Sequence, residues 1–225
     1  GKSYDSTFIE MPYRKAIWRM EKIVLNRIVG GLGKSSDITH LDFACGTGRV
    51  ISFLEVLTHK SMGVDISPSM LEIARQNVSS ELIEADITQS NPFSGQHFDL
   101  ITSFRFFPNA EPELREDVMA QLVSLVSNNG RLVFNNHRNT DSFFASIKNR
   151  FFGTEYPGMS RAEVENLIEK FGFEVDRVFS LGIFPDSFSP KIIPSSALFL
   201  LEKIFLKLMN SLRLGYDEIY VCKMK

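Results

Sequence analysis

A short apolar run that ends in a carboxylate and leads into a glycine turn constrains the fold of this chain most strongly. Residues 41–50 read Leu-Asp-Phe-Ala-Cys-Gly-Thr-Gly-Arg-Val. A strand, a turn of small residues and the start of a helix form the first unit of an open α/β sheet, where a nucleotide-like ligand approaches the backbone. Gly46 and Gly48 have no Cβ that would obstruct such a ligand.

Two further carboxylates end apolar runs later in the chain. Asp65 closes a Met-Gly-Val-Asp segment, and Asp86 closes a Leu-Ile-Glu-Ala-Asp segment. Because the carboxyl ends of parallel strands share one edge of a sheet, we expect Asp42, Asp65 and Asp86 along one rim. Asp65 follows Gly46 by 19 residues, about the spacing at which an acidic residue meets a ribose in such folds.

The chemistry of these carboxylates fits an adenosine. Asp65 can accept hydrogen bonds from both ribose hydroxyls and would repel a 2′-phosphate. Asp86 can accept from the exocyclic amine of adenine, and Ile66 and Ile87, which follow the two acids, can contact the flat base. A nicotinamide dinucleotide site would need a further glycine three residues after Gly48, where Ile51 stands.

Composition narrows the class of protein. The 225 residues are enough for one domain with insertions, and 44% apolar and 23% charged residues are typical of a globular protein. A formal net charge of −2 argues against a broad surface for nucleic acid or another polyanion. The two cysteines, Cys45 and Cys222, provide no disulfide framework and favour a reducing, cytoplasmic environment. We expect neither a leader sequence nor a membrane span.

Periodicity and turn residues predict an alternation of strands and helices. We expect strands at residues 40–44, 61–65, 81–85, 98–103, 131–136, 173–180 and 217–223, and helices at residues 12–29, 49–57, 67–77, 112–126 and 160–171. An Asn-Asn-Gly sequence at residues 128–130 predicts a break before the fifth strand, and Ser160 with Glu163 forms a capping-box pattern. Five strand–helix alternations predict a parallel sheet with right-handed crossovers. Residues 137–159 and 183–216 do not fit the alternation, and we expect these insertions to shape a substrate site.

This constellation closely resembles the class I S-adenosylmethionine-dependent methyltransferases, in particular their small-molecule branch (types 11 and 25). The motifs that carry the resemblance lie between Leu41 and Asn136, and the remainder agrees in strand order alone. The resemblance implies one domain over residues 1–225, with a Rossmann-like, doubly wound sheet of seven strands. The implied order is 3-2-1-4-5-7-6, with the last strand antiparallel and with helical insertions after strands five and six. It also implies S-adenosylmethionine as cofactor and S-adenosylhomocysteine as product.

The resemblance assigns cofactor roles position by position. The glycine turn with Asp42 would hold the methionine part, Asp65 the ribose and Asp86 the adenine, while the end of the fourth strand would face the methyl group. The predicted cofactor residues are Asp42, Ala44, Gly46, Gly48, Asp65, Ile66, Asp86, Ile87, Ser103 and Tyr13. The family usually has glycine at the position of Ala44, and we interpret the small alanine as tolerated. No metal is expected.

Two regions outside the glycine motif bear on the acceptor. Tyr13 lies in a helical segment, residues 1–36, that resembles the lid of small-molecule members, although an unrelated packing helix fits as well. Nothing after the fourth strand resembles the Asn/Asp-Pro-Pro-Tyr/Phe motif of enzymes that methylate base amines, so we expect no nucleic acid as acceptor.

Residues that could act on the acceptor follow strands four and five. His137 can be a base near neutral pH, or a loop histidine with no proton to move. Arg105 and Arg138 fit an anionic acceptor, such as a carboxylate or a phosphate, but a surface arginine is a common alternative. We therefore predict methyl transfer to a small molecule, favouring an oxygen acceptor and leaving nitrogen and carbon open, with His137 and Arg105 as the candidate catalytic residues.

A helix predicted at residues 195–213 has a distinct apolar stripe. The stripe consists of Leu198, Leu201, Phe205, Leu208 and Leu212, and Lys203, Lys207 and Asn210 fall on the opposite face. Such a helix could cover the core or the acceptor site, pair with a second copy in a homodimer, or contact a membrane surface. The alternative functions are therefore a cofactor-binding protein without transferase activity, or a module that binds a membrane surface or a partner.

Overall fold

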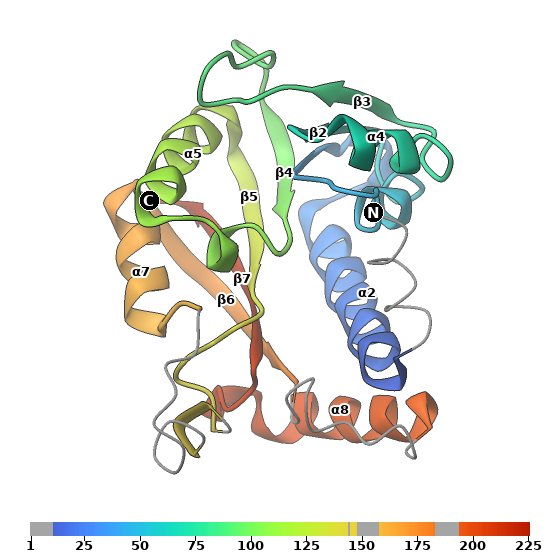
Figure 1. The fold of residues 1–225 in the computed structure, drawn as a ribbon, viewed down its shortest axis with the longest axis vertical. Coiled ribbons are helices and arrows are strands. Elements are labelled where there is room, and N and C mark those ends of the chain that lie inside the picture. The colour runs from blue at the N-terminus through green and yellow to red at the C-terminus, as the bar shows by residue number, and fades with distance from the viewer. Residues whose placement is uncertain (1–10, 144, 148–157, 183–193) are drawn as a thin grey trace.

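The fold is an open seven-stranded sheet with helices on both faces (Figure 1). The computed structural model describes residues 11–143, 145–147, 158–182 and 194–225. The strands are β1 (Thr39–Phe43), β2 (Lys60–Asp65), β3 (Glu81–Glu84), β4 (Phe98–Ser103), β5 (Val126–Asn136), β6 (Phe173–Leu181) and β7 (Asp217–Met224). The helices are α2 (Pro12–Leu32), α3 (Ile51–Leu54), α4 (Pro68–Ala74), α5 (Pro112–Leu125), α7 (Arg161–Lys170) and α8 (Ser195–Met209).

The strand order is β3-β2-β1-β4-β5-β7-β6. Strands β1 to β5 pair in parallel, whereas β7 pairs antiparallel with both β5 and β6. This confirms the predicted topology, including the reversed last strand. The order reverses direction between β1 and β4, and the crevice at such a switch point is where open α/β sheets bind their ligands.

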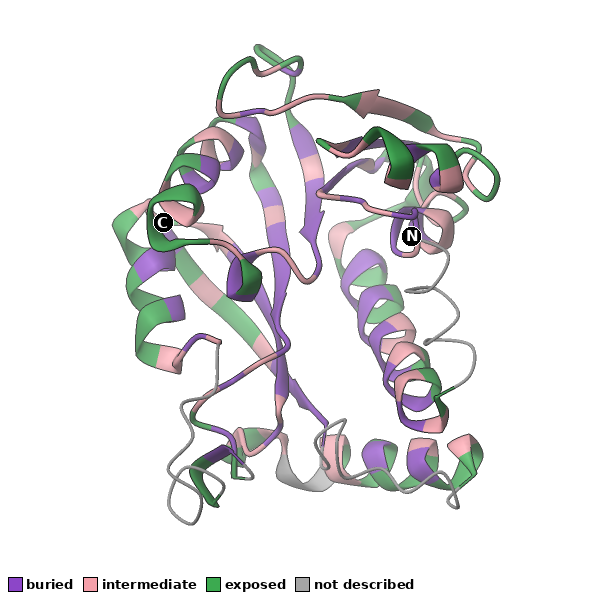
Figure 2. Ribbon diagram, in the orientation of Figure 1, coloured by how far each residue is buried: buried purple, intermediate pink, exposed green. Residues whose placement is uncertain are grey.

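Each face of the sheet is covered by its own pair of helices (Figure 2). Helices α5 and α7 pack on one face, through Leu122 and Ile168 among others. Helices α2 and α3 pack on the other, where Met20, Val24 and Leu25 of α2 are fully buried. Each such side chain contributes roughly 2 kcal/mol by leaving water. The predicted lid segment therefore includes a core helix, and residues 1–10 of it lie outside the described part.

Local signals placed the starts of α4 and α7 correctly. Ser67 caps α4, where its hydroxyl accepts from the amide of Met70 at 3.4 Å, and Pro68 takes the first helical position. The predicted capping box at the start of α7 is present: the amide of Ser160 donates to Oε2 of Glu163 at 2.7 Å, and the amide of Glu163 donates back to Oγ of Ser160 at 3.2 Å.

Several element boundaries differ from the prediction by a few residues, and those of α3 and β5 bear on the site. Helix α3 covers only Ile51–Leu54, and residues 55–57 form a turn. Strand β5 begins at Val126, so the Asn-Asn-Gly segment lies inside the strand, where the pairing with β4 shifts from Val126 to Arg131. The predicted break is thus an irregularity within β5. A Cβ at Gly130 would lie 2.8 Å from the carbonyl oxygen of Phe98, which explains a glycine at this close approach.

Helix α8 confirms that the insertion after strand six is helical, but its buried face is not the predicted stripe. Leu198 is buried, whereas Leu201 and Leu212 are 45% and 55% exposed. Glu202 faces inward, and its Oε2 accepts from the amide of Gly182 at 3.0 Å. Asn210, predicted on the solvent side, accepts from the amide of Ser180 at 2.8 Å. Polar contacts with the end of β6 therefore set the rotation of this helix, and the side chain of the predicted Leu208 lies outside the described residues.

Candidate functional site

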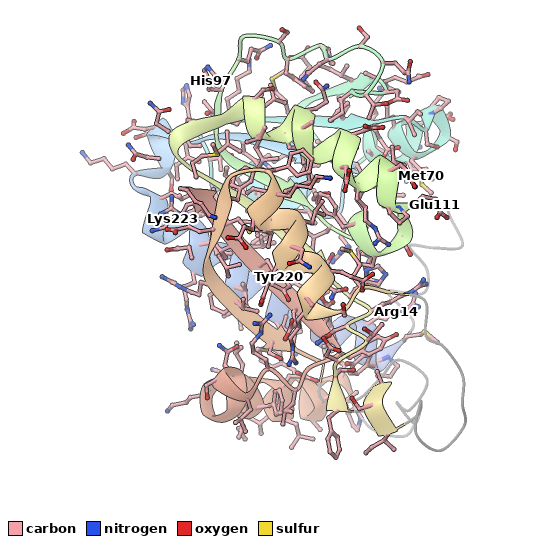
Figure 3. The ribbon with its side chains drawn as sticks, turned by 90° about the vertical axis from the view of Figure 1, so that its left-hand side faces the viewer. Arg14, Met70, His97, Glu111, Tyr220 and Lys223 are labelled. Carbon is pink, nitrogen blue, oxygen red and sulfur yellow. The ribbon has the colours of Figure 1, made fainter. Side chains whose placement is uncertain are left out.

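The carboxyl ends of β1, β2 and β4 surround a cleft of about 290 Å³. Its lining comprises Asp42, Ala44, Cys45, Gly46, Thr47, Arg49, Val50, Asp65, Ser67, Met70, Phe104 and Arg105. Met70 lies on the same side of the molecule as Arg14, at the start of α2, and Glu111 (Figure 3). The structure thus brings the glycine turn, two of the three predicted acids and Arg105 to one site.

The glycine turn owes its shape to three residues with positive φ. The φ angles of Ala44, Gly46 and Gly48 are 54°, 56° and 84°. A Cβ at Gly46 would meet nothing within 4 Å, so this backbone is open to a ligand, whereas a Cβ at Gly48 would lie 2.6 Å from the side chain of Val78. Ala44 keeps its Cβ in a left-handed conformation that costs roughly 1 kcal/mol, which explains why glycine is usual at this position in the resembling family.

Asp65 holds the glycine turn in place. Its Oδ2 accepts from the amide of Gly46 at 2.7 Å, and its Oδ1 accepts from the amide of Ser67 at 2.9 Å. A carboxylate has about four acceptor positions, so both oxygens retain capacity for a further donor. The half-buried side chain lines the cleft. Its position suits two ribose hydroxyls, although that role stays a prediction.

Asp42 lies beneath the turn and is 2% exposed. Its Oδ1 accepts from the hydroxyl of Thr102 at 2.6 Å, and its Oδ2 accepts from the amide of Ile51, at the start of α3, at 3.2 Å. Burial raises the pKa of this carboxyl to about 7, and the hydrogen bond from Thr102 and the charge of Arg49 oppose that rise. Asp42 therefore changes its charge in the neutral pH range, unlike an ordinary aspartic acid.

The residues predicted to hold the adenine lie beside this cleft and not among its lining residues. Oδ1 of Asp86 accepts from the amide and the hydroxyl of Thr88, at 3.0 and 2.7 Å, and so closes a turn after β3. Ile66 is 65% exposed and is free to cover a base, whereas the side chain of Ile87 is 2% exposed and packs in the core. The adenine roles of these residues stay predictions.

The loop after β4 is fixed in a strained conformation. Arg105 has a φ of 67°, which is rare for a residue with a Cβ. Its amide donates to Oδ1 of Asn135 at 2.6 Å, and its carbonyl oxygen accepts from Nδ2 of Asn109 at 2.6 Å. Nδ2 of Asn135 donates in turn to Oδ1 of Asp217, at the start of β7, at 3.1 Å. Three elements therefore hold Arg105 and Phe104 against the cleft.

His137 lies just past β5 and is buried, with 8% of its surface exposed. Burial lowers its pKa well below the usual range, and the charges of Arg105 and Arg138 lower it further. Its Nδ1 and the hydroxyl of the fully buried Ser103 have no hydrogen-bond partner among the described residues. Neither His137 nor Ser103 is among the residues that line the cleft, and their predicted roles at the ends of β5 and β4 stay predictions.

Comparison with known proteins agrees with this geometry. Residues 41–130, from β1 into β5, match the family described as "Methyltransferase domain". This segment of the chain is therefore similar to a methyltransferase domain. A curated protein of Anoxybacillus flavithermus, described as an uncharacterized methyltransferase, is 27% identical over 136 residues, which are 60% of this chain and 62% of that protein. The chain thus matches less than two thirds of the length of this relative.

Solved structures of S-adenosylmethionine-dependent methyltransferases share the fold of this chain. The magnesium protoporphyrin IX methyltransferase of Synechocystis PCC 6803, with bound S-adenosylhomocysteine, has a TM-score of 0.65 and 16% identity, covering 97% of this chain and 88% of its own. An S-adenosylmethionine-dependent methyltransferase of Clostridium acetobutylicum ATCC 824 has a TM-score of 0.61 and 15% identity, covering 99% of this chain and 98% of its own.

Helix α2 reaches the cleft through residues that the sequence analysis missed. Arg49, which lines the cleft, forms an ion pair with the buried Glu21 of α2, and its guanidinium lies 4.4 Å from the ring centre of Trp18. Tyr13, the predicted lid residue, is buried beside Gly182 and Leu198 instead and does not line the cleft. In the sequence, the signal for this contact was Glu21, a charged residue on the apolar side of the predicted helix.

Proposed function

We propose that the chain transfers a methyl group from S-adenosylmethionine to an oxygen atom of a small, acidic molecule. The observation that carries this proposal is the glycine turn, held open toward the cleft by Asp65. The match of residues 41–130 to the methyltransferase domain supports the reaction class. The magnesium protoporphyrin IX methyltransferase, as its name says, acts on a small molecule, and its fold supports the same class of acceptor here.

In this proposal, the three acids and the glycine turn bind the cofactor, and the loop after β4 aligns the acceptor. S-adenosylmethionine, when bound, supplies a methyl group that is already activated on a sulfonium. Asp65 would hold the ribose and Asp86 the adenine, and Asp42 and the glycine turn would hold the methionine part. Since the donor is activated, most of the rate comes from aligning the acceptor with the methyl group in a dry site. The fixed turn at Phe104 and Arg105 suits that alignment.

The electrostatics around His137 favour an acceptor oxygen that ionises easily. Four guanidinium groups act on this histidine, those of Arg105, Arg138, Arg49 and Arg14. Positive charge stabilises a phenolate, an enolate or a carboxylate, and it disfavours a protonated amine. Because its pKa is lowered, His137 stores no proton near neutral pH and would accept one only as the methyl group moves. An acidic acceptor needs no stronger base.

The test combines the reaction with a variant. Methyl-labelled S-adenosylmethionine is incubated with the chain and a panel of phenols, carboxylic acids and primary amines, and S-adenosylhomocysteine is measured. We expect turnover with members of the first two classes. His137→Ala should lower kcat at least about tenfold while the affinity for S-adenosylhomocysteine stays within about twofold. His97→Ala, at an exposed position, is the matched control. Turnover with amines alone, or normal turnover in His137→Ala, would contradict the proposal.

Helix α8 supports a second, separate candidate, contact with a membrane surface. Leu200, Leu201 and Ile204 are 57%, 45% and 47% exposed, and Lys203 and Lys207 are exposed beside them. Apolar side chains with flanking lysines suit an anionic bilayer surface. No described helix is both long and apolar enough to cross a bilayer. Co-sedimentation with phosphatidylglycerol vesicles should fail for Leu201→Asp and persist for Leu114→Asp, which alters a leucine that is 40% exposed on α5.

A further inference from the structure

A chain of buried polar side chains runs beneath the sheet face that supports the cofactor turn. His40 is fully buried in β1, and its Nε2 lies 2.8 Å from the hydroxyl of Thr102 in β4. Its Nδ1 lies 2.9 Å from the hydroxyl of Ser61 in β2, which lies 2.9 Å from the hydroxyl of Thr58. Thr102 also contacts Oδ1 of Asp42 at 2.6 Å. The polar chain thus consists of Asp42, Thr102, His40, Ser61 and Thr58.

The strand register explains this arrangement. His40 and Asp42 are two residues apart on β1 and therefore point to the same face of the sheet. In the ladder, Ser61 pairs with His40, and Thr102 pairs with Asp42, so the neighbouring strands supply one hydroxyl each. Burial lowers the pKa of His40 to about 3, so the ring stays neutral and carries one proton. Which nitrogen carries that proton depends on its two neighbours.

Counting protons gives two complete arrangements for the same atomic positions. With Asp42 ionised, Thr102 donates to Asp42, Nε2 of His40 donates to Thr102, Ser61 donates to Nδ1, and Thr58 donates to Ser61. With Asp42 neutral, every bond reverses: Asp42 donates to Thr102, Thr102 to Nε2, Nδ1 to Ser61, and Ser61 to Thr58. The hydroxyl of Thr58 then donates to the carbonyl oxygen of Leu54, which lies 3.0 Å away.

We propose that His40 is a positioning residue of the cofactor site, which holds Asp42 through this polar chain and relays a proton between that carboxyl and the opposite edge of the sheet. Ser61 lines a separate surface pocket with Glu55 and His59, at the amino ends of β2 and β3. When Asp42 ionises, its Oδ1 passes a proton to Thr102, and Thr102, His40 and Ser61 each pass one on, until Thr58 releases one at the opposite edge. The proton of His40 moves from Nδ1 to Nε2, no heavy atom moves, and the reverse sequence protonates Asp42.

The relay matters because a ligand in the cleft separates Asp42 from water. Asp42 is already 2% exposed, and it lines the cleft. The charged groups that act on it are Arg49, which favours the ionised carboxylate, and Asp65, which opposes it. Since the sulfonium and the ammonium of S-adenosylmethionine are cationic, the ionised carboxylate should favour this ligand. The polar chain lets Asp42 reach that state after the cleft is filled.

Nitrogen-15 NMR of the unliganded chain tests the relay directly. We expect His40 to remain neutral from about pH 5.5 to 8.5 and to carry its proton on Nδ1 at the acidic end and on Nε2 at the basic end. The change should coincide with the carbon-13 titration of Asp42. The exposed His59 and His97 serve as references in the same spectra. One tautomer throughout, or an imidazolium at His40, would overturn the proposal.

A second measurement uses the ligand, and it rests on the proposed cofactor, whereas the NMR result does not. S-adenosylmethionine should bind at least about threefold more tightly at pH 8 than at pH 6. Ser61→Ala leaves Nδ1 without a partner, and a buried N–H without an acceptor costs more than a bare nitrogen, so Asp42 should ionise at lower pH. The midpoint of the affinity profile should therefore move to lower pH.

The matched control is Ser52→Ala, which removes a hydroxyl on α3 that donates to the carbonyl of Arg49 at 3.1 Å, outside the polar chain. It should leave the midpoint unchanged. A Ser61→Ala variant whose affinity drops equally at every pH would show a purely structural role for the chain and refute the relay. Failure of all variants and of the natural chain to bind S-adenosylmethionine would refute the cofactor instead, with the NMR test still decisive for His40.

Discussion

Replacing Asp65 with alanine should weaken cofactor binding by two separable effects. The variant loses the acceptors of the Gly46 and Ser67 amides, and it loses the carboxylate oxygens proposed for the ribose hydroxyls. A hydrogen bond to a charged group contributes about 1.5–3 kcal/mol when buried and less at this half-buried position. Because the bonds to the turn also form without ligand, only part of their loss appears in binding. We expect a total loss of about 2–3 kcal/mol, or roughly 30- to 150-fold in Kd.

Titration calorimetry with S-adenosylhomocysteine and with its 2′-deoxyribose analogue separates the two effects. Removing the ribose hydroxyl should cost the natural chain several-fold in affinity and the Asp65→Ala variant almost nothing, since its partner is already gone. Glu84→Ala is the matched control, because Glu84 is exposed on β3 and pairs in register with Asp65. It removes a nearby charge and should change Kd less than about twofold. Equal affinity of Asp65→Ala and the natural chain for S-adenosylhomocysteine would refute the ribose assignment.

Three further outcomes follow from the site. Asp86→Ala should relax selection for the adenine amine, so that S-adenosylhomocysteine loses affinity and its inosine analogue does not; equal losses in calorimetry would contradict this role. Asp42→Asn should stabilise the unliganded chain, because the pKa of Asp42 is raised to about 7 in the folded state and its ionisation costs stability as pH rises from about 4 to 7. The gain in thermal unfolding should appear over that range and reach at most about 4 kcal/mol, whereas a gain confined to acid pH would exclude the raised pKa. Ala44→Gly should relieve the left-handed strain and raise the melting temperature, and Ala44→Val should lower it. A melting temperature that is lower for Ala44→Gly than for Ala44→Val would show that the positive φ of residue 44 does not strain the folded chain.

The family resemblance predicted the strand order, whereas the residues alone predicted best what is encoded within a few positions. Ser67 and Pro68 start α4, and Ser160 with Glu163 starts α7, because caps act inside one turn. The start of β5 was predicted five residues late, since the Asn-Asn-Gly segment is favourable for a turn in isolation. Pairing with β4 across a register shift outweighs that preference. Such pairing depends on a strand far away in the sequence, and no local pattern reports it.

Helix α8 shows the same limit for side-chain environments. Its apolar periodicity identified a helix, and Leu198 does face the core. Periodicity alone placed Leu201 on the buried face, because an isolated helix gives no information about its polar partners. In the fold, the amide of Gly182 needs an acceptor, and Glu202 supplies it. Satisfying that buried amide outweighs the transfer of one more leucine from water.

The two halves of the candidate site differ in the same way. The cofactor half is local, because Asp42, Ala44 and Gly46 belong to one strand and the turn that follows it, and Asp65 ends the neighbouring strand. A motif can therefore report it. The wall predicted for the acceptor is assembled from residues far apart: Asn135 and Asp217 are 82 positions apart, and the side chain of Asn135 joins Asp217 to the amide of Arg105. Each of these residues alone has many structural uses. Only their convergence on a strained turn shows that the chain fixes one wall of the cleft.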